Sequence, residues 1–131
     1  MPPILLGVQR TEKGFKVRIL PEIFPKENKE NREAKEVLPG MNIRTFWGNE
    51  MLISIVDIEP HAVVPNHSHP HEQAGTIMSG ELEMTIGGET RLLKSGDTYI
   101  IPGNVEHSAQ AGDAPARVLD VFSPVREEYQ Y

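Results

Sequence analysis

The chain has 131 residues, a net charge of −6 at neutral pH and no cysteine. Its length suffices for one domain with its own core, and the lack of cysteine excludes disulfides, thiolate metal ligands and cysteine nucleophiles. The acidic balance argues against a nucleic-acid partner, because phosphates attract basic surfaces. The N-terminus does not resemble a signal peptide, and no apolar run approaches the ~20 residues of a membrane span. We therefore expect a cytoplasmic protein without membrane attachment.

The segment Lys26 to Val37 is a fourfold triplet with the sequence KEN-KEN-REA-KEV. A period of three does not place apolar residues on one stripe of a helix with 3.6 residues per turn. Its ion pairs four residues apart run from Lys or Arg to Glu, which is the weaker orientation on a helix. We therefore expect a solvated loop or a frayed short helix, and a lid over a barrel mouth is the alternative.

Five short runs of alternating polarity follow and are typical of strands: Leu52 to Glu59, Glu81 to Ile86, Thr90 to Leu93, Thr98 to Ile101 and Arg117 to Phe122. The pair Gly87-Gly88 predicts a tight hairpin between two of them. Many short strands separated by turn residues indicate an all-β sandwich or barrel. We expect one domain over residues 1–131, with an N-terminal strand and the charged loop in 1–40 and the barrel in 41–125.

Four of the five histidines lie within eleven residues, at positions 61, 67, 69 and 71, and the fifth is His107. On an extended strand, side chains two residues apart point to the same side, so His67 and His69 can aim at one point. A later antiparallel strand can bring His107 beside them, and neutral imidazole is the commonest ligand for divalent transition metals. The pattern therefore predicts a metal site, whereas His61 follows a proline in an expected turn and is interpreted as a surface residue.

Two motifs around these histidines resemble those of the cupin superfamily. The first consists of His67, His69, position 73 and Gly80, and the second of Gly96, Pro102 and His107. The resemblance implies a small antiparallel jelly-roll β-barrel with little helix. It also implies one divalent transition metal ion (Mn, Fe, Ni, Zn or Cu) bound by His67, His69, Gln73 and His107.

Gln73 stands where the cupin motif usually has a glutamate. Because an amide oxygen carries no charge, the metal would keep its 2+ charge, which favours Lewis-acid chemistry on an anionic substrate over dioxygen chemistry. Three alternatives remain at this point. Gln73 can lie behind a metal-bound water, His71 can be a ligand if Pro70 does not end the strand, and Glu72 can replace Gln73 if the register slips by one residue.

Near the C-terminus, Asp120 interrupts an apolar run that ends at Phe122, and Arg126 follows. A buried aspartate is unfavourable unless it is paired, so Asp120 has either a structural partner or a function. The sequence Asp-x-Phe-Ser-Pro-x-Arg resembles pectin-degradation cupins that linearise 4,5-unsaturated uronates. That resemblance implies that Asp120 handles a proton, that Phe122 shapes the pocket and that Arg126 binds the sugar carboxylate. The alternative is a structural Asp120–Arg126 ion pair, with Glu127 and Glu128 competing for the arginine.

Three functions follow from these features. The first is a metal-dependent enzyme of the isomerase or hydratase type that acts on a small anion such as a sugar acid. The second is a metal-dependent dioxygenase with iron, manganese or copper, and the third is a cupin that binds a small molecule without catalysis. We also expect a homodimer, from the resemblance and from the general frequency of twofold symmetric dimers.

Overall fold

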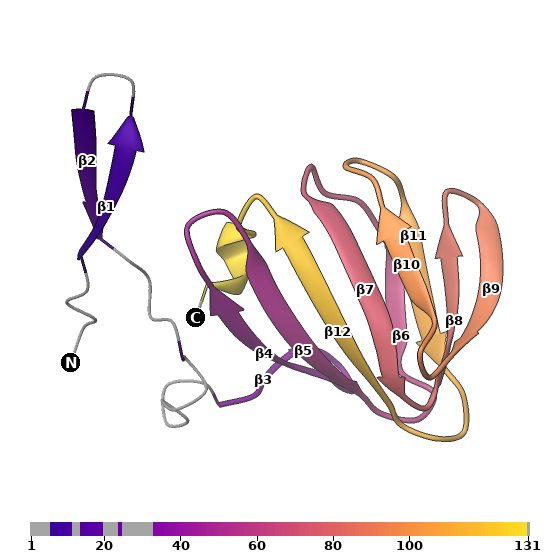
Figure 1. The fold of residues 1–131 in the computed structure, drawn as a ribbon. Helices are drawn as coiled ribbons and strands as arrows, with labels where there is room; N and C mark the ends of the chain where they lie inside the picture. Colours follow the sequence, from indigo (N-terminus) through magenta and orange to yellow (C-terminus); the bar gives the residue numbers. More distant parts are fainter. Residues whose placement is uncertain (1–5, 12–13, 20–23, 25–32, 131) are drawn as a thin grey trace.

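The computed structural model describes residues 6–11, 14–19, 24 and 33–130, and these residues form almost entirely β-structure (Figure 1). The elements in chain order are β1 (Leu6–Thr11), β2 (Gly14–Ile19), β3 (Lys35–Leu38), β4 (Met41–Trp47), β5 (Leu52–Ile58), β6 (Val63–His67), β7 (Glu72–Ser79), β8 (Glu81–Ile86), β9 (Glu89–Lys94), β10 (Thr98–Ile101), β11 (His107–Ala111), β12 (Ala116–Ser123) and the 3-10 helix η3 (Glu127–Tyr129).

Two sheets make up the barrel, and every strand pair in the described ranges is antiparallel. The six-stranded sheet has the order β10-β7-β12-β5-β4-β3, and the four-stranded sheet has the order β6-β11-β8-β9. Strands β1 and β2 pair with each other in a separate two-stranded sheet. The predicted small antiparallel jelly-roll barrel with little helix is thereby confirmed.

The core lies between the inward faces of the two sheets. In β5, the residues at alternate positions from Leu52 to Ile58 are buried, as expected for a strand with one face in a core. In β8, Leu82 and Met84 are buried and Ile86 is half-buried, whereas Glu81 and Glu83 are exposed, as expected from the alternating polarity of this run. All five predicted strands are present, and the residues Gly87-Gly88 join β8 to β9.

The triplet segment was predicted wrongly at its C-terminal end. Residues 26–32 lie outside the described residues, but Lys35, Glu36 and Val37 belong to strand β3, which pairs with β4 at the edge of the six-stranded sheet. Lys35 and Glu36 are exposed, whereas Val37 and Leu38 pack against the core. The edge position explains the charged composition, because only one side of an edge strand is paired and one of its faces meets solvent.

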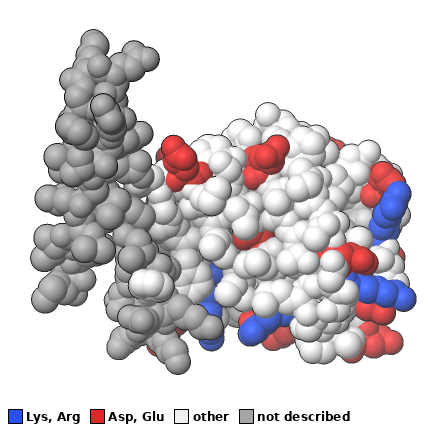
Figure 2. Space-filling model, in the orientation of Figure 1, with Lys and Arg blue, Asp and Glu red and all other residues white. Residues whose placement is uncertain are grey.

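Exposed apolar side chains lie on the outer face of the six-stranded sheet, among them Ile53, Met78 and Ile100. Figure 2 shows a broad uncharged area on the face turned to the viewer, with most charged side chains toward its margins. Among the described residues, no helix is both long enough and apolar enough to span a membrane.

Candidate metal centre

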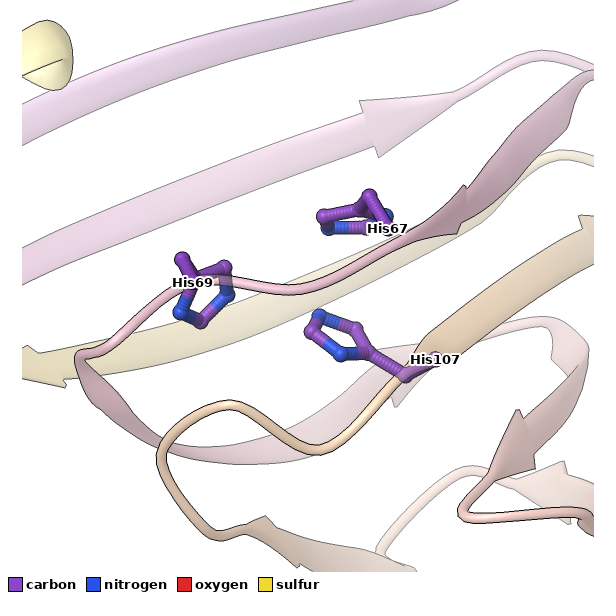
Figure 3. A group of neighbouring side chains, drawn as sticks. All are labelled: His67, His69 and His107. Carbon is purple, nitrogen blue, oxygen red and sulfur yellow. The ribbon is translucent and has the colours of Figure 1, made fainter.

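Three imidazoles converge at one end of the barrel, as Figure 3 shows. His67 is the last residue of β6, and it lies directly opposite His107, the first residue of β11. His69 comes from the loop after β6. The potential ligand atoms of the three side chains all lie within 4.8 Å of one another. The predicted grouping is therefore present in space.

His67 and His69 lie close together, but not for the predicted reason that both belong to one extended strand. Strand β6 ends at His67, so the two residues do not share one extended strand. The loop that carries His69 is held against the loop before β11, because the backbone N–H of Asn104 donates to the His69 carbonyl at 2.7 Å. The predicted break at Pro70 is present, since β7 begins only at Glu72.

Each imidazole has its Nδ1 atom beside a backbone carbonyl two residues away in the sequence. The distances are 2.8 Å from His67 to Pro65, 3.0 Å from His69 to His71 and 2.9 Å from His107 to Val105. Because a carbonyl only accepts, each Nδ1 carries the proton, and the Nε2 lone pair of each neutral ring is left for a ligand. A ring N–H group that donates to a backbone carbonyl is typical of histidines that bind metal.

The electrostatics keep the rings of His69 and His107 neutral. Burial, with the charges of Arg126 and His107, lowers the pKa of His69 to about 4. Burial also lowers the pKa of His107, and its Nε2 atom is buried without a hydrogen-bond partner among the described residues. A cation held between the three Nε2 atoms would satisfy these lone pairs, so the residues present fit a divalent transition metal.

Gln73 lies in β7 on the opposite sheet, with its Oε1 atom 3.1 Å from Nε2 of His69. Since Nδ1 of His69 donates to a carbonyl, its Nε2 atom and the amide oxygen are two acceptors that face each other. The amide nitrogen of Gln73 is on the other side, where a hydrogen bond to Asp120 lowers the pKa of that carboxyl. Gln73 therefore connects the three-histidine group to Asp120.

A cavity of about 350 Å³ opens beside the histidines and extends into the barrel. Aliphatic side chains such as Val56 and Met84 line its inner part. Its polar lining includes Ser54, Gln73, Tyr99, Asp120 and Arg126, together with His67 and His107. The cavity therefore joins an apolar chamber to a polar region that contains both acidic and basic groups.

Asp120 is buried in β12, and the Tyr99 hydroxyl donates a short hydrogen bond to its Oδ1 atom. Burial raises the pKa of the Asp120 carboxyl to about 6, although the hydrogen bonds from Tyr99 and Gln73 and the charge of Arg126 act in the opposite direction. The structure does not contain the alternative, a structural Asp120–Arg126 ion pair. Asp120 is bound to Tyr99, and Arg126 pairs with Glu128, one of the two glutamates expected to compete for it.

Arg126 lies beside the cavity with its side chain only 12% exposed. Its Nε atom donates to Oε1 of Glu128 at 2.5 Å, and its guanidinium lies 4.0 Å from the centre of the Tyr129 ring and 5.2 Å from that of Phe122. The Phe122 ring in turn contacts the ring of His69, with 5.6 Å between the centroids. The two aromatic rings and Glu128 therefore fix the guanidinium at the edge of the cavity.

The remaining candidates lie outside this group. Glu72 is exposed, so the register slip that would bring it into the site does not occur. His71 contributes its backbone carbonyl to His69, but its ring is not one of the three that converge. His61 is exposed at a turn and lies 3.2 Å from Asp113, as expected for a surface residue.

Sequence reasoning did not find Ser54, Tyr99 or Tyr129, and it named Glu128 only as a competitor for Arg126. For Ser54 and Tyr99 a signal existed, because both occupy inward positions of predicted strands whose other inward residues are apolar. For Tyr129 no local pattern was available, since it lies in a 3-10 helix of three residues.

A family model described as a cupin domain matches residues 54–122. The chain belongs to the cupin family. In the region of similarity it is 30% identical over 84 residues to the pectin degradation protein KdgF of Dickeya dadantii, which covers 63% of this chain and 76% of that protein.

Solved structures agree with this assignment. The structure of KdgF from a Halomonas species is 29% identical and has a TM-score of 0.70, over 76% of this chain and 92% of that one. An RmlC-like cupin from Shewanella frigidimarina is 25% identical with a TM-score of 0.71, over 76% of this chain and 90% of the other. The chain is thus a cupin that resembles KdgF in both sequence and structure, as expected.

Proposed function

We propose that this cupin is a metal-dependent isomerase that converts 4,5-unsaturated uronates into linear keto sugars. One observation carries the proposal: a single cavity is lined by two of the three converging imidazoles, a buried carboxyl and a fixed guanidinium. Similarity to the pectin degradation protein KdgF supports an acidic sugar as the substrate class.

In this proposal His67, His69 and His107 hold one divalent transition metal, with the Gln73 amide oxygen as a fourth ligand. The bound ion supplies Lewis acidity, which stabilises negative charge on substrate oxygens. Because none of the four ligands is charged, the ion keeps its full 2+ charge toward an anionic substrate. The contacts of the three Nδ1 atoms with backbone carbonyls leave the Nε2 atoms to bind the ion.

The other groups of the cavity bind the substrate and move the proton. Arg126 would bind the uronate carboxylate through the guanidinium atoms that Glu128 does not use. Phe122 would shape the cavity beside His69. The reaction is an isomerisation without net gain or loss of atoms. The anomeric hydroxyl loses a proton, the bond from the anomeric carbon to the ring oxygen breaks, and C4 of the resulting enol gains a proton. We assign the transfer of that proton to Asp120, whose buried carboxyl lines the cavity.

The test follows the ultraviolet absorbance of an unsaturated uronate with protein stripped of metal and then reloaded with Mn, Fe, Ni, Zn or Cu. We expect faster loss of absorbance with at least one reloaded form and none above background with the stripped form. Oxygen uptake is recorded in parallel with the same samples. Oxygen consumption without an isomerised product would favour the dioxygenase, and binding without turnover would favour a non-catalytic cupin. A homodimer remains a prediction.

A further inference from the structure

A row of small or polar residues crosses the inward face of the six-stranded sheet. The strand register places Thr45 opposite Ser54, Ser54 opposite Asp120, Asp120 opposite Gly75, and Gly75 opposite Tyr99. The four side chains of this row are all at most 8% exposed. The row interrupts a face that is otherwise mostly apolar, and three of its members line the cavity.

All but one of these side chains have a protein partner. The Tyr99 hydroxyl donates to Asp120, and the Thr45 hydroxyl donates to the backbone carbonyl of Tyr129 at 2.5 Å. Ser54 is only 1% exposed, and its hydroxyl has no hydrogen-bond partner within the described part of the chain. Buried hydroxyl groups are nearly always hydrogen-bonded, because leaving one unpaired is unfavourable.

Packing does not explain a serine at this position. The other inward residues of β5 are Leu52, Val56 and Ile58, and an alanine would fill the space of Ser54 without an unpaired polar atom. Packing within the chain therefore does not account for the hydroxyl, and Ser54 is one of the residues that line the cavity.

We propose that Ser54 is a substrate-binding residue whose hydroxyl forms a hydrogen bond with a hydroxyl group of a sugar acid in the cavity. This inference rests on the proposed function and specifies its substrate further. As neighbours on adjacent strands, Ser54 and Asp120 have Cβ atoms about 5 Å apart, so both can reach one sugar ring. A serine hydroxyl both donates and accepts, which suits a sugar hydroxyl, while Arg126 takes the carboxylate.

The site would therefore select hydroxylated acids over acids that lack the hydroxyl facing Ser54. A site built to hydrogen-bond a substrate hydroxyl discriminates strongly against an analogue without it, because the protein group is then left unpaired. The aliphatic side chains of the cavity cannot by themselves distinguish an acid that has this hydroxyl from one that lacks it.

The experiment compares the wild type with the variant Ser54→Ala and with the control Ser95→Ala. The hydroxyl of Ser95 donates to the Met78 carbonyl in an exposed turn away from the cavity. Three quantities are measured on metal-loaded protein: the kinetics with an unsaturated uronate, the Kd for D-galacturonate and the Tm without ligand. For Ser54→Ala we expect KM and Kd to rise about 10-fold, with a smaller change in kcat and a Tm equal to or above that of the wild type.

The outcomes separate this inference from the proposed function. Unchanged KM and Kd in Ser54→Ala, or a clear fall in its Tm, would show that Ser54 is structural. In that case turnover of the uronate by the wild type would still support the isomerase. If the wild type does not convert the uronate but binds galacturonate more tightly than Ser54→Ala, the reaction is wrong and the role of Ser54 stands. Absence of galacturonate binding to the wild type would overturn the role of Ser54. Ser95→Ala should bind and react like the wild type.

Discussion

At the scale of single residues, the glycine at position 75 leaves room for the hydrogen bond between Tyr99 and Asp120. Gly75 lies between Tyr99 and Asp120 in the strand register. A Cβ atom added there would overlap both the Tyr99 ring and Oδ1 of Asp120. The short hydrogen bond between these two side chains therefore passes over a glycine, and a larger residue would separate them.

We predict that Gly75→Ala destabilises the protein by about 1–3 kcal/mol, as expected for overpacking in a core. Urea denaturation monitored by tyrosine and tryptophan fluorescence measures this difference. If the proposed mechanism is right, the variant also loses most activity, because Asp120 no longer has a fixed position. Gly112→Ala is the matched control, since an added Cβ there has no atom within 4 Å. Equal stability of the two variants would contradict the prediction.

A second prediction at this scale concerns Arg126. Arg126→Lys keeps the charge but loses the planar guanidinium that lies over Tyr129, so we expect a KM for the uronate raised roughly 10- to 100-fold. Arg126→Ala should raise KM further. Arg117→Lys is the control, because Arg117 forms an exposed ion pair with Asp57 outside the cavity. Steady-state kinetics with a KM no different from that of Arg117→Lys would remove Arg126 from substrate binding.

The residues of the site differ in how far the sequence can predict them. His67, His69 and His107 were predictable because they occur at the spacing of the two cupin motifs. The expectation that the first two share one strand was wrong. Tyr99 and Asp120 are 21 residues apart, and their contact depends on strand β7 lying between β10 and β12. Such pairs across three strands follow from sheet order, which local alternation of polarity does not determine.

At the scale of elements, the short C-terminal helix η3 connects the sheet to Arg126. The carbonyl of Tyr129 accepts from Thr45 in β4, and the Tyr129 ring packs against both Phe122 and Arg126. Three residues of 3-10 helix carry no hydrophobic period. The sequence therefore predicted the alternating strands, but neither this element nor the contacts of Tyr129.

We predict that the aromatic ring of Tyr129, and not its hydroxyl, positions Arg126. Tyr129→Phe keeps the ring under the guanidinium and should leave KM within about twofold of the wild type. Tyr129→Ala should raise KM about 10-fold or more, because a cation–π contact and the packing against Phe122 are lost. Parallel measurement of KM and kcat tests this, and an equal loss in both variants would point to the hydroxyl instead.

At the scale of the whole molecule, the candidate metal centre lies where the two sheets of the barrel meet. His67 and His107 belong to the four-stranded sheet, and Gln73 belongs to the six-stranded sheet. His69 lies in the segment that crosses from one sheet to the other. A bound ion would therefore connect the sheets at this end of the barrel, in addition to any chemistry that it performs.

The last prediction follows from this position. An ion that binds only the folded protein stabilises it in proportion to the logarithm of its concentration, by about 4 kcal/mol at 1,000 times Kd. Scanning calorimetry should therefore show a Tm that rises on the order of 10 °C when metal is added to stripped protein. His67→Ala should abolish most of this rise, whereas the exposed His61→Ala should retain it. A rise of equal size in both variants would place the ion elsewhere. No rise in the wild type would mean that the three converging imidazoles do not bind the metals tested.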